Sequence, residues 1–322
     1  MRPTNCIEIV ACFVAAAFAA APALGQDYPT KPVRIIAGSA GAMPDIVTRH
    51  LAQRLSERWG QPVVVENRPV ILISATVAAK APADGYTLLM ADRTSHAVAP
   101  SLFKNLAYDP IRDFEPIALV ARAALMLVVH PSVPAASLRE FIAYAKQRPG
   151  ALDFASAGPG TAAHVAHELM RKSAGIDFQN VHYKGGGAAM MAIVSGEAKA
   201  GFVLMPVALP QVNARRVKAL AVSGTARFAG APDVPTAAEA GLPGYEADFW
   251  IGMFAPAHTP VAILAKLNRD IVAVMQTGAM RETLLVQGAE PAAGTPAEFV
   301  NLIASETAKL KKLIEDTGMR VD

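Results

Sequence analysis

Two short runs, Val33-Arg34-Ile35-Ile36 and Val63-Val64-Val65-Glu66, flank an amphipathic segment at residues 46–59, and this stretch decides the fold class. Both runs are rich in β-branched residues, which is typical of buried strands. The segment between them repeats apolar residues at helical spacing, and Gly60-Gln61-Pro62 is expected to end that helix. A strand, a helix and a second strand in this order predict a parallel sheet covered by helices.

The alternation of strand and helix continues to residue 130, where Pro131-Ser132-Val133-Pro134 interrupts it before a second series begins. Strands of the second series are expected at 153–156, 180–183, 200–203 and 219–222. C-terminal helices are expected at 260–275, 279–287 and 296–317. This organisation predicts an α/β protein of two lobes, each with a sheet flanked by helices.

The N-terminus has the layout of a secretory signal peptide, with an apolar run from Ile9 to Ala23 before Ala23-Leu24-Gly25. The run is about 15 residues long, shorter than the roughly 20 that span a bilayer. We predict a signal peptide at 1–25 and a periplasmic mature protein; a retained anchor and lipid attachment at Cys12 are the alternatives. Both cysteines, Cys6 and Cys12, lie in this leader, so no mature disulfide or cysteine-bound metal is expected.

Charge and composition argue against a nucleic-acid-binding protein. The chain has 30 Lys and Arg residues against 27 Asp and Glu residues, and no basic run marks a binding face. Aromatic residues make up only 6%, which disfavours stacking on bases. Beyond the leader no apolar run reaches membrane-spanning length, so we expect a soluble mature protein that binds no nucleic acid.

Four loops are predicted between a strand end and a helix start, which is where open α/β sheets place their ligands. They lie at 37–44, 68–74, 156–161 and 184–187. Amides at helix N-termini carry partial positive charge and attract carboxylate or phosphate groups. A small anion is therefore the expected cargo.

The third and fourth loops each allow a functional and a structural interpretation. Ser156-Ala157-Gly158-Pro159-Gly160-Thr161 combines glycines with two hydroxyls that could donate hydrogen bonds, or it is a Gly-Pro turn capped by Thr161. Tyr183-Lys184-Gly185-Gly186-Gly187 offers a phenol and an ammonium, but it lacks the Gly-x4-Gly-Lys order of a nucleotide-binding loop. The residues alone favour an ordinary flexible turn there.

No constellation of residues points to catalysis or to a metal. His164 and His167 lie three residues apart beside Glu168, but the order departs from His-Glu-x-x-His and a third ligand is not apparent. Histidines on the surface or at a lobe contact are the favoured interpretation. Ser156 lacks a Gly-x-Ser-x-Gly context. We expect neither enzyme activity nor a cofactor, with a secreted hydrolase using Ser156 or the His164/His167 pair as the alternative.

A series of motifs, in order, resembles the Bug-type extracytoplasmic receptors of tripartite tricarboxylate transporters over nearly the whole mature chain. The motifs are Tyr28-Pro29-Thr30-Lys31-Pro32-Val33-Arg34, Val64-Val65-Glu66-Asn67-Arg68-Pro69, Ala83-Asp84-Gly85-Tyr86-Thr87-Leu88, Ala155-Ser156-Ala157-Gly158, His182-Tyr183-Lys184-Gly185-Gly186-Gly187, Pro232-Asp233-Val234-Pro235-Thr236 and Glu239-Ala240-Gly241-Leu242-Pro243-Gly244-Tyr245.

This resemblance implies a type II periplasmic-binding-protein fold, in which two lobes close over a carboxylate ligand in the interlobe cleft and a membrane permease accepts it. It implies a first lobe at 26–130 and 245–322, a second lobe at 131–244, and a protein expected to be monomeric. The ligand would be held by loop amides and hydroxyls. By position, the implied ligand-binding residues are Ser39, Ala40, Ala42, Ser156, Gly160, Thr161, Ala162, Lys184 and Gly185.

Three departures from the family pattern bear on the cargo. The first loop reads Ala40-Gly41-Ala42-Met43-Pro44-Asp45 where family members are richer in glycine, and the second reads Val70-Ile71-Leu72-Ile73-Ser74. Val203 stands where many relatives have an acidic residue. We therefore predict a carboxylate with an apolar body, such as an aromatic or medium-chain acid, and disfavour an amino acid. A ligand-sensing partner of a membrane signalling protein is a further alternative.

Overall fold

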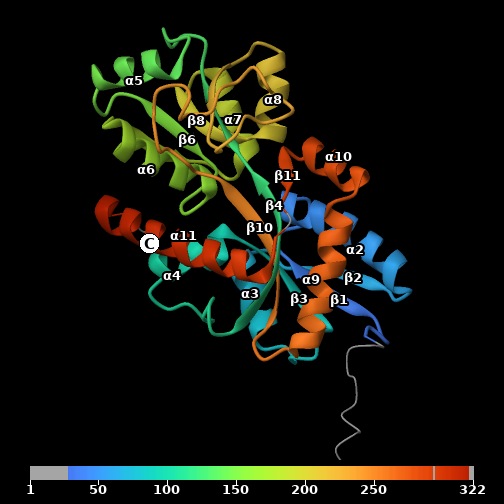
Figure 1. Ribbon diagram of the computed structural model, residues 1–322. Coiled ribbons are helices and arrows are strands. Elements are labelled where there is room, and N and C mark those ends of the chain that lie inside the picture. Colours follow the sequence, from blue (N-terminus) through green and yellow to red (C-terminus); the bar gives the residue numbers. More distant parts are fainter. Residues whose placement is uncertain (1–27, 293, 319–322) are drawn as a thin grey trace, which may run out of the picture.

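The computed structural model describes residues 28–292 and 294–318. The predicted signal peptide and both cysteines lie outside these ranges, so the leader stays a prediction. Two separate sheets, each flanked by helices, form two lobes (Figure 1). The predicted α/β class with two lobes is confirmed. Within the described ranges, no helix combines the length and the apolar character that crossing a bilayer requires.

The first lobe is built on a six-stranded mixed sheet of order β11-β4-β10-β3-β1-β2. Its strands are β1 (Val33–Ala37), β2 (Val63–Asn67), β3 (Thr87–Asp92), β4 (Phe114–Ala123), β10 (Phe249–Pro256) and β11 (Ala289–Pro291). Strand β1 pairs in parallel with β2 and β3, as the strand–helix–strand pattern predicts, whereas β10 runs antiparallel to β3 and β4.

The second lobe is built on a five-stranded mixed sheet of order β7-β6-β8-β5-β9. Its strands are β5 (Leu125–Val129), β6 (Asp153–Ser156), β7 (Gln179–His182), β8 (Ala200–Leu204) and β9 (Lys218–Val222). Strand β6 is parallel to β7 and β8, and β5 is antiparallel to β8 and β9.

Helices cover both sheets (Figure 1). In the first lobe they are α2 (Met43–Trp59), α3 (Ile71–Ala79), the π-helical turn η1 (Thr94–Val98), α4 (Ala99–Leu102), α9 (Val261–Met275), α10 (Gly278–Val286) and α11 (Pro296–Thr317). In the second lobe they are α5 (Leu138–Lys146), α6 (Ala162–Ala174), α7 (Gly186–Ser195) and α8 (Met205–Asn213). Helix α11 lies against the first lobe and reaches α6, where Lys172 pairs with Asp316.

Each lobe has its own apolar core. In the first, Val33 and Ile35 of β1 and Leu51 and Leu55 of α2 are fully buried, and Gly60 ends α2 in the left-handed conformation at φ 63°. The i, i+4 spacing of the two leucines places them on one helical face, so the face predicted from the sequence is the one that packs on the sheet. In the second core, the rings of Phe154 and Phe178 stack with centroids 3.9 Å apart.

A single residue, Ala124, separates β4 of the first sheet from β5 of the second. The lobe boundaries predicted from the sequence remain a prediction, and this strand pairing favours moving the first of them from residue 130 to Ala124. The antiparallel pairing of β4 with β10 sets the outgoing and returning chain side by side at the crossing (Figure 1).

The second loop, predicted at 68–74, is shorter than expected, because α3 already begins at Ile71. Val70 is the N-cap, and Ile71 belongs to the first helical turn. The buried Ser74 hydroxyl donates to the Ala37 carbonyl at 2.8 Å and ties this turn to the end of β1. Tertiary packing thus overrides the low helix propensity of the branched residues.

Candidate functional site

A cavity of about 390 Å³ is lined by residues of both lobes. Its first-lobe wall comes from the ends of β1 and β3 and from the starts of α2 and α3. Its second-lobe wall comes from β8 and from the starts of α6, α7 and α8. The lining residues are Gly38, Ser39, Ala42, Met43, Pro44, Pro69, Val70, Ile71, Asp92, Thr94, Leu125, Ala157, Thr161, Ala162, Ala163, Gly186, Ala189, Phe202, Val203, Leu204, Val207 and Phe249.

Five helices begin at this cavity, namely α2, α3, α6, α7 and α8, the last through its N-cap Leu204. The N-caps of α2, α3 and α7 are Ala42, Val70 and Gly185, and none of them makes a side-chain cap hydrogen bond. The first amides of these helices therefore keep their donors for a ligand or for solvent. Their partial positive charge makes the cavity suited to an anion.

The hydroxyls that were expected to donate to a ligand already donate to the protein. Ser39 Oγ donates to the Pro69 carbonyl at 2.6 Å and joins the first two loops. Thr161 Oγ1 donates to the Gly158 carbonyl at 2.8 Å and accepts from the His164 amide at 3.5 Å, so it caps α6. The interpretation of Thr161 as a helix cap is confirmed. Thr161 also lines the cavity, and hydrogen bonding of this loop to a ligand remains a prediction.

The structure brings only some of the nine predicted ligand-binding residues to the cavity. Those that line it are Ser39, Ala42, Thr161 and Ala162; those that do not are Ala40, Ser156, Gly160, Lys184 and Gly185. The Ser156 side chain is fully buried and its Oγ lies 2.6 Å from His182 Nδ1, while the side chain of Lys184 is exposed. Ligand contact by any of the nine remains a prediction.

Several lining residues were not predicted. Asp92 ends β3, directly after the apolar run Leu88-Leu89-Met90-Ala91, so its position at a strand end was a usable signal. Phe202 and Phe249 could not be found in this way, because the side of a strand that faces the cleft depends on pairing and twist. The rest of the lining is largely apolar, and among the described residues Asp92 is its only ionisable side chain.

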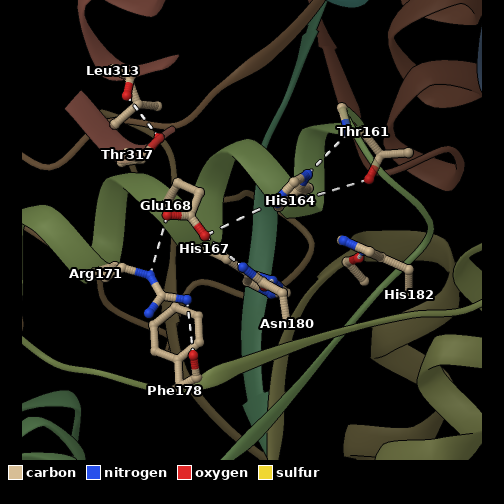
Figure 2. Close-up of polar contacts among 12 residues, drawn as sticks. Thr161, His164, His167, Glu168, Arg171, Phe178, Asn180, His182, Leu313 and Thr317 are labelled. Carbon is tan, nitrogen blue, oxygen red and sulfur yellow. Dashed lines mark hydrogen bonds and ion pairs between the residues drawn. The ribbon is translucent and has the colours of Figure 1, made fainter. Parts of the chain in front are cut away.

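His164 and His167 are buried, so the expectation of surface or lobe-contact histidines was wrong in placing them on the surface (Figure 2). His167 Nε2 accepts a hydrogen bond from the Phe202 amide at 3.0 Å, and its Nδ1 lies 2.8 Å from Asn180 Oδ1. Because the Phe202 amide donates to Nε2, this nitrogen carries no hydrogen. Nδ1 therefore carries it, and the ring is neutral. Burial lowers the pKa of His167 to about 3, in agreement with that state.

His164 supports the third loop from behind. Its Nδ1 accepts a hydrogen bond from the Gly160 amide at 3.0 Å. Burial lowers its pKa to about 4, with smaller contributions from His182 and Arg171. The ring of His182, whose Nδ1 forms a hydrogen bond with Ser156 Oγ, lies edge-on to the ring of His164, with centroids 4.7 Å apart (Figure 2). The histidines thus hold the wall of the cavity without entering it.

Neither the metal site nor the hydrolase alternative gains support. In the part of the chain that the structure describes, no group of three or more His, Cys, Asp or Glu side chains is arranged to hold a metal. The proposed nucleophile Ser156 is buried and does not line the cavity. The arrangement is that of a binding site built from helix N-termini and apolar side chains.

Comparison with known proteins finds a family model described as "Tripartite tricarboxylate transporter family receptor", which matches residues 47–319. The chain is 34% identical to Protein BugT of Bordetella pertussis over 100% of both chains. Among solved structures it is similar to an R. palustris protein with adipate, at TM-score 0.80 and 32% identity over 91% of this chain and 99% of that one. It is also similar to MatC from Rhodopseudomonas palustris with bound malate, at TM-score 0.75 and 30% identity over 89% and 100%.

Proposed function

The chain belongs to the receptor family of tripartite tricarboxylate transporters, and from this premise we propose that it captures a small carboxylate with an apolar body for the permease of such a transporter. The family is one of solute-binding receptors, so the protein is a binding protein and not an enzyme. The observation that carries the proposal is the interlobe cavity at which α2, α3, α6, α7 and α8 begin.

The helix starts support a carboxylate as the cargo. Their amides supply partial positive charge in a site that contains no Lys or Arg among the described lining residues. A carboxylate can accept hydrogen bonds from several amides at once, and such charge-assisted bonds are stronger than neutral ones. Structural relatives solved with adipate and with malate, both carboxylates, agree with this assignment.

The remaining lining supports an apolar body. Met43, Val70 and Ile71 face Phe202 and Val203 across the same cavity, and these side chains offer hydrocarbon to the ligand. Burying apolar ligand surface contributes roughly 25 cal/mol per Å². An aromatic or medium-chain acid gains this contribution, whereas a short and strongly hydrated acid gains little. Val203 supplies no charge for a ligand ammonium, which disfavours amino acids.

The cellular role follows from the family and from the leader. Residues 1–25 have the pattern of a signal peptide, and a structural relative that is 34% identical over 92% of this chain is described as a periplasmic transporter. We therefore assign the mature protein to the periplasm, with permease subunits of a tripartite transporter as its partners.

A thermal-shift panel of aliphatic, aromatic and tricarboxylic acids tests the cargo class. A ligand that binds only the folded protein adds about 2.7 kcal/mol at a concentration of 100 Kd, so the right acid raises Tm clearly. We expect the largest shifts from medium-chain and aromatic acids. Shifts with sugars or cationic amines, together with none from any carboxylate, would overturn the assignment.

A matched pair of variants tests whether the cavity is the site. Ala42 and Ala40 are both exposed in the first loop, but only Ala42 lines the cavity. Ala42→Trp places an indole in the ligand's space and is expected to weaken binding at least tenfold, with Tm of the free protein little changed. Ala40→Trp is the control and should bind as the unmodified protein does. Equal effects of the two variants would place the ligand elsewhere.

A further inference from the structure

Asp92 occupies an unusual electrostatic position in the cavity. It is the last residue of β3, its side chain is only 8% exposed, and among the described residues that line the cavity it alone is ionisable. The neighbouring Arg93 does not neutralise it, because Arg93 Nε pairs with Glu306 Oε2 at 2.7 Å. No ion pair to Asp92 is formed within the described ranges.

The local structure needs an acceptor at residue 92 but does not need a charge. Asp92 Oδ1 accepts from the Ser95 amide at 3.0 Å and lies 3.3 Å from the Ser95 hydroxyl, an arrangement that caps the start of η1. Among the described residues, Oδ2 accepts no hydrogen bond of ordinary length and geometry. The amide oxygen of asparagine could fill the capping role. The capping role alone therefore does not explain why residue 92 is an ionisable carboxyl group.

The charge balance of the cavity supplies that explanation. Several helix N-termini open onto it and contribute partial positive charge, but no Lys or Arg side chain lines it among the described residues. The Asp92 carboxylate offsets part of that partial charge. Each further negative charge that a ligand brings into the cavity is therefore repelled by Asp92 and meets no side-chain cation.

We propose that Asp92 is a specificity-determining residue that limits the cargo to a single negative charge, so that the receptor selects monocarboxylates over dicarboxylates. The inference deepens the proposed function and rests on it. The far end of the cargo is then apolar or carries a hydrogen-bond donor. In this respect the protein differs from the structural relatives solved with adipate and malate, which are dicarboxylates.

The size of the cavity makes the discrimination strong. A sphere of about 390 Å³ is roughly 9 Å across, close to one Debye length at physiological ionic strength, so a second ligand charge cannot escape Asp92 by distance or screening. At an effective dielectric constant of about 20, repulsion over such distances changes affinity by a factor on the order of thirty. Burial raises the pKa of Asp92 to about 6, against opposing hydrogen bonds from Ser95 and Thr94, so the group is ionised at pH 8.

Calorimetric titration at pH 8 with adipate and with its monomethyl ester tests the proposal, since the two probes have the same chain and differ by one charge. The unmodified protein is expected to bind the ester at least tenfold more tightly. Asp92→Asn retains the cap acceptor, and it should improve adipate binding at least tenfold more than ester binding, because adipate brings one more charge near residue 92. Glu282→Gln removes an exposed charge on α10, away from the cavity lining, and should leave both affinities unchanged.

The outcomes separate the two hypotheses. Equal affinity of the unmodified protein for both probes, or an Asp92→Asn variant that still prefers the ester to the same degree, overturns the charge selection and leaves the carboxylate receptor intact. Failure of every carboxylate to bind overturns the proposed function itself. The comparison of the two probes in the unmodified protein does not depend on the variant, and Asp92→Ser, which also keeps an acceptor, replaces Asp92→Asn if that variant does not fold.

Discussion

In the first lobe a buried carboxylate holds the cavity loop in place, whereas in the second lobe neutral histidines do so. Asp45 Oδ2 accepts from the Gly41 amide at 2.8 Å, and its Oδ1 accepts from Asn67 at 2.8 Å and pairs with Arg49 at 3.0 Å. Across the cavity, His164 accepts from the Gly160 amide. Residues of both loops line the cavity, but one loop is held by an ionised carboxylate and the other by a neutral imidazole.

The difference shows how each wall responds to acid. Burial opposes ionisation of Asp45, but the Gly41, Asn67 and Arg49 hydrogen bonds outweigh it and lower its pKa below 3.8. Its contribution is therefore lost only as pH falls below that value. The His164 pKa is lowered from 6.5 to about 4, so its contribution is full above 6.5 and is lost as pH falls from there to about 4. As pH falls, the second-lobe wall should therefore lose stability at a higher pH than the first-lobe wall does.

The largest effect is expected where the first wall loses its carboxylate. Asp45→Ala leaves the Gly41 amide and the Asn67 amide group without their acceptor and breaks the pair with Arg49, and we expect about 3 kcal/mol of lost stability. Urea unfolding measures this free energy. Glu315→Ala is the control, because Glu315 forms an exposed pair with Lys311 at 4.0 Å and its loss should cost less than 1 kcal/mol. Similar losses of unfolding free energy in the two variants would show that the Asp45 carboxylate does not support the first-lobe wall in particular.

Removing the histidine support should have the next largest effect. His164→Ala is expected to cost about 2 kcal/mol, because the buried Gly160 amide loses its partner and a small cavity forms. The variant should also flatten the decline of stability between pH 6.5 and 4 in urea titrations. His50→Ala, on the exposed face of α2, is the control with little expected change. If the stability of His164→Ala fell as steeply between pH 6.5 and 4 as that of the unmodified protein, another group would be responsible for the decline.

The Asp92→Asn variant tests whether every carboxylate of the first-lobe wall stabilises the folded protein. Its pKa is raised from 3.8 to about 6 by burial, so the charged form is disfavoured and stability is lost as pH rises through this window. Asp92→Asn should therefore gain about 1–2 kcal/mol at pH 8 and nothing at pH 4. The buried neighbours do not titrate in this window, because burial lowers the pKa of His96 to about 3 and raises that of Tyr108. Loss of stability at pH 8 would contradict this prediction.

The same titration should appear in binding. The measured quantity is the adipate affinity of Asp92→Asn divided by that of the unmodified protein at the same pH. Protonation of adipate itself affects both affinities equally and drops out of this ratio. It is expected to fall toward one as pH decreases from 8 to 5, since protonated Asp92 no longer repels a second carboxylate. Arg93 lies beside Asp92 in the chain, but it pairs with Glu306 and not with Asp92. A ratio independent of pH would point to a steric origin.

The smallest effect is expected at the contact between α6 and α11, outside both walls. Lys172 and Asp316 form an ion pair there with half-exposed side chains. Lys172→Ala should change the unfolding free energy by less than 1 kcal/mol, because solvent and side-chain entropy offset such pairs. Binding affinity for the cargo should stay the same, and a clear change in affinity would indicate that this contact contributes to lobe closure.

Local patterns in the sequence were sufficient for the elements that build the walls. The strand–helix–strand unit of β1, α2 and β2 was predicted close to its observed bounds, and the helix predicted at 296–317 is observed as α11 over the same residues. These predictions succeed because periodicity and Gly-Pro breaks are local properties. The start of α3 was missed, because a bond from Ser74 to the Ala37 carbonyl of another strand helps to set it.

By itself, the sequence determined the α/β class, the two-lobe organisation and the family, since alternating apolar segments and ordered motifs are written along the chain. Only the tertiary structure decided that Ala42 reaches the cavity while Ala40 does not, that His164 supports a loop from inside the core, and that Asp92 lines the cavity. The reason is physical: burial, protonation state and the partners of an amide depend on groups far away in sequence, which only folding brings together.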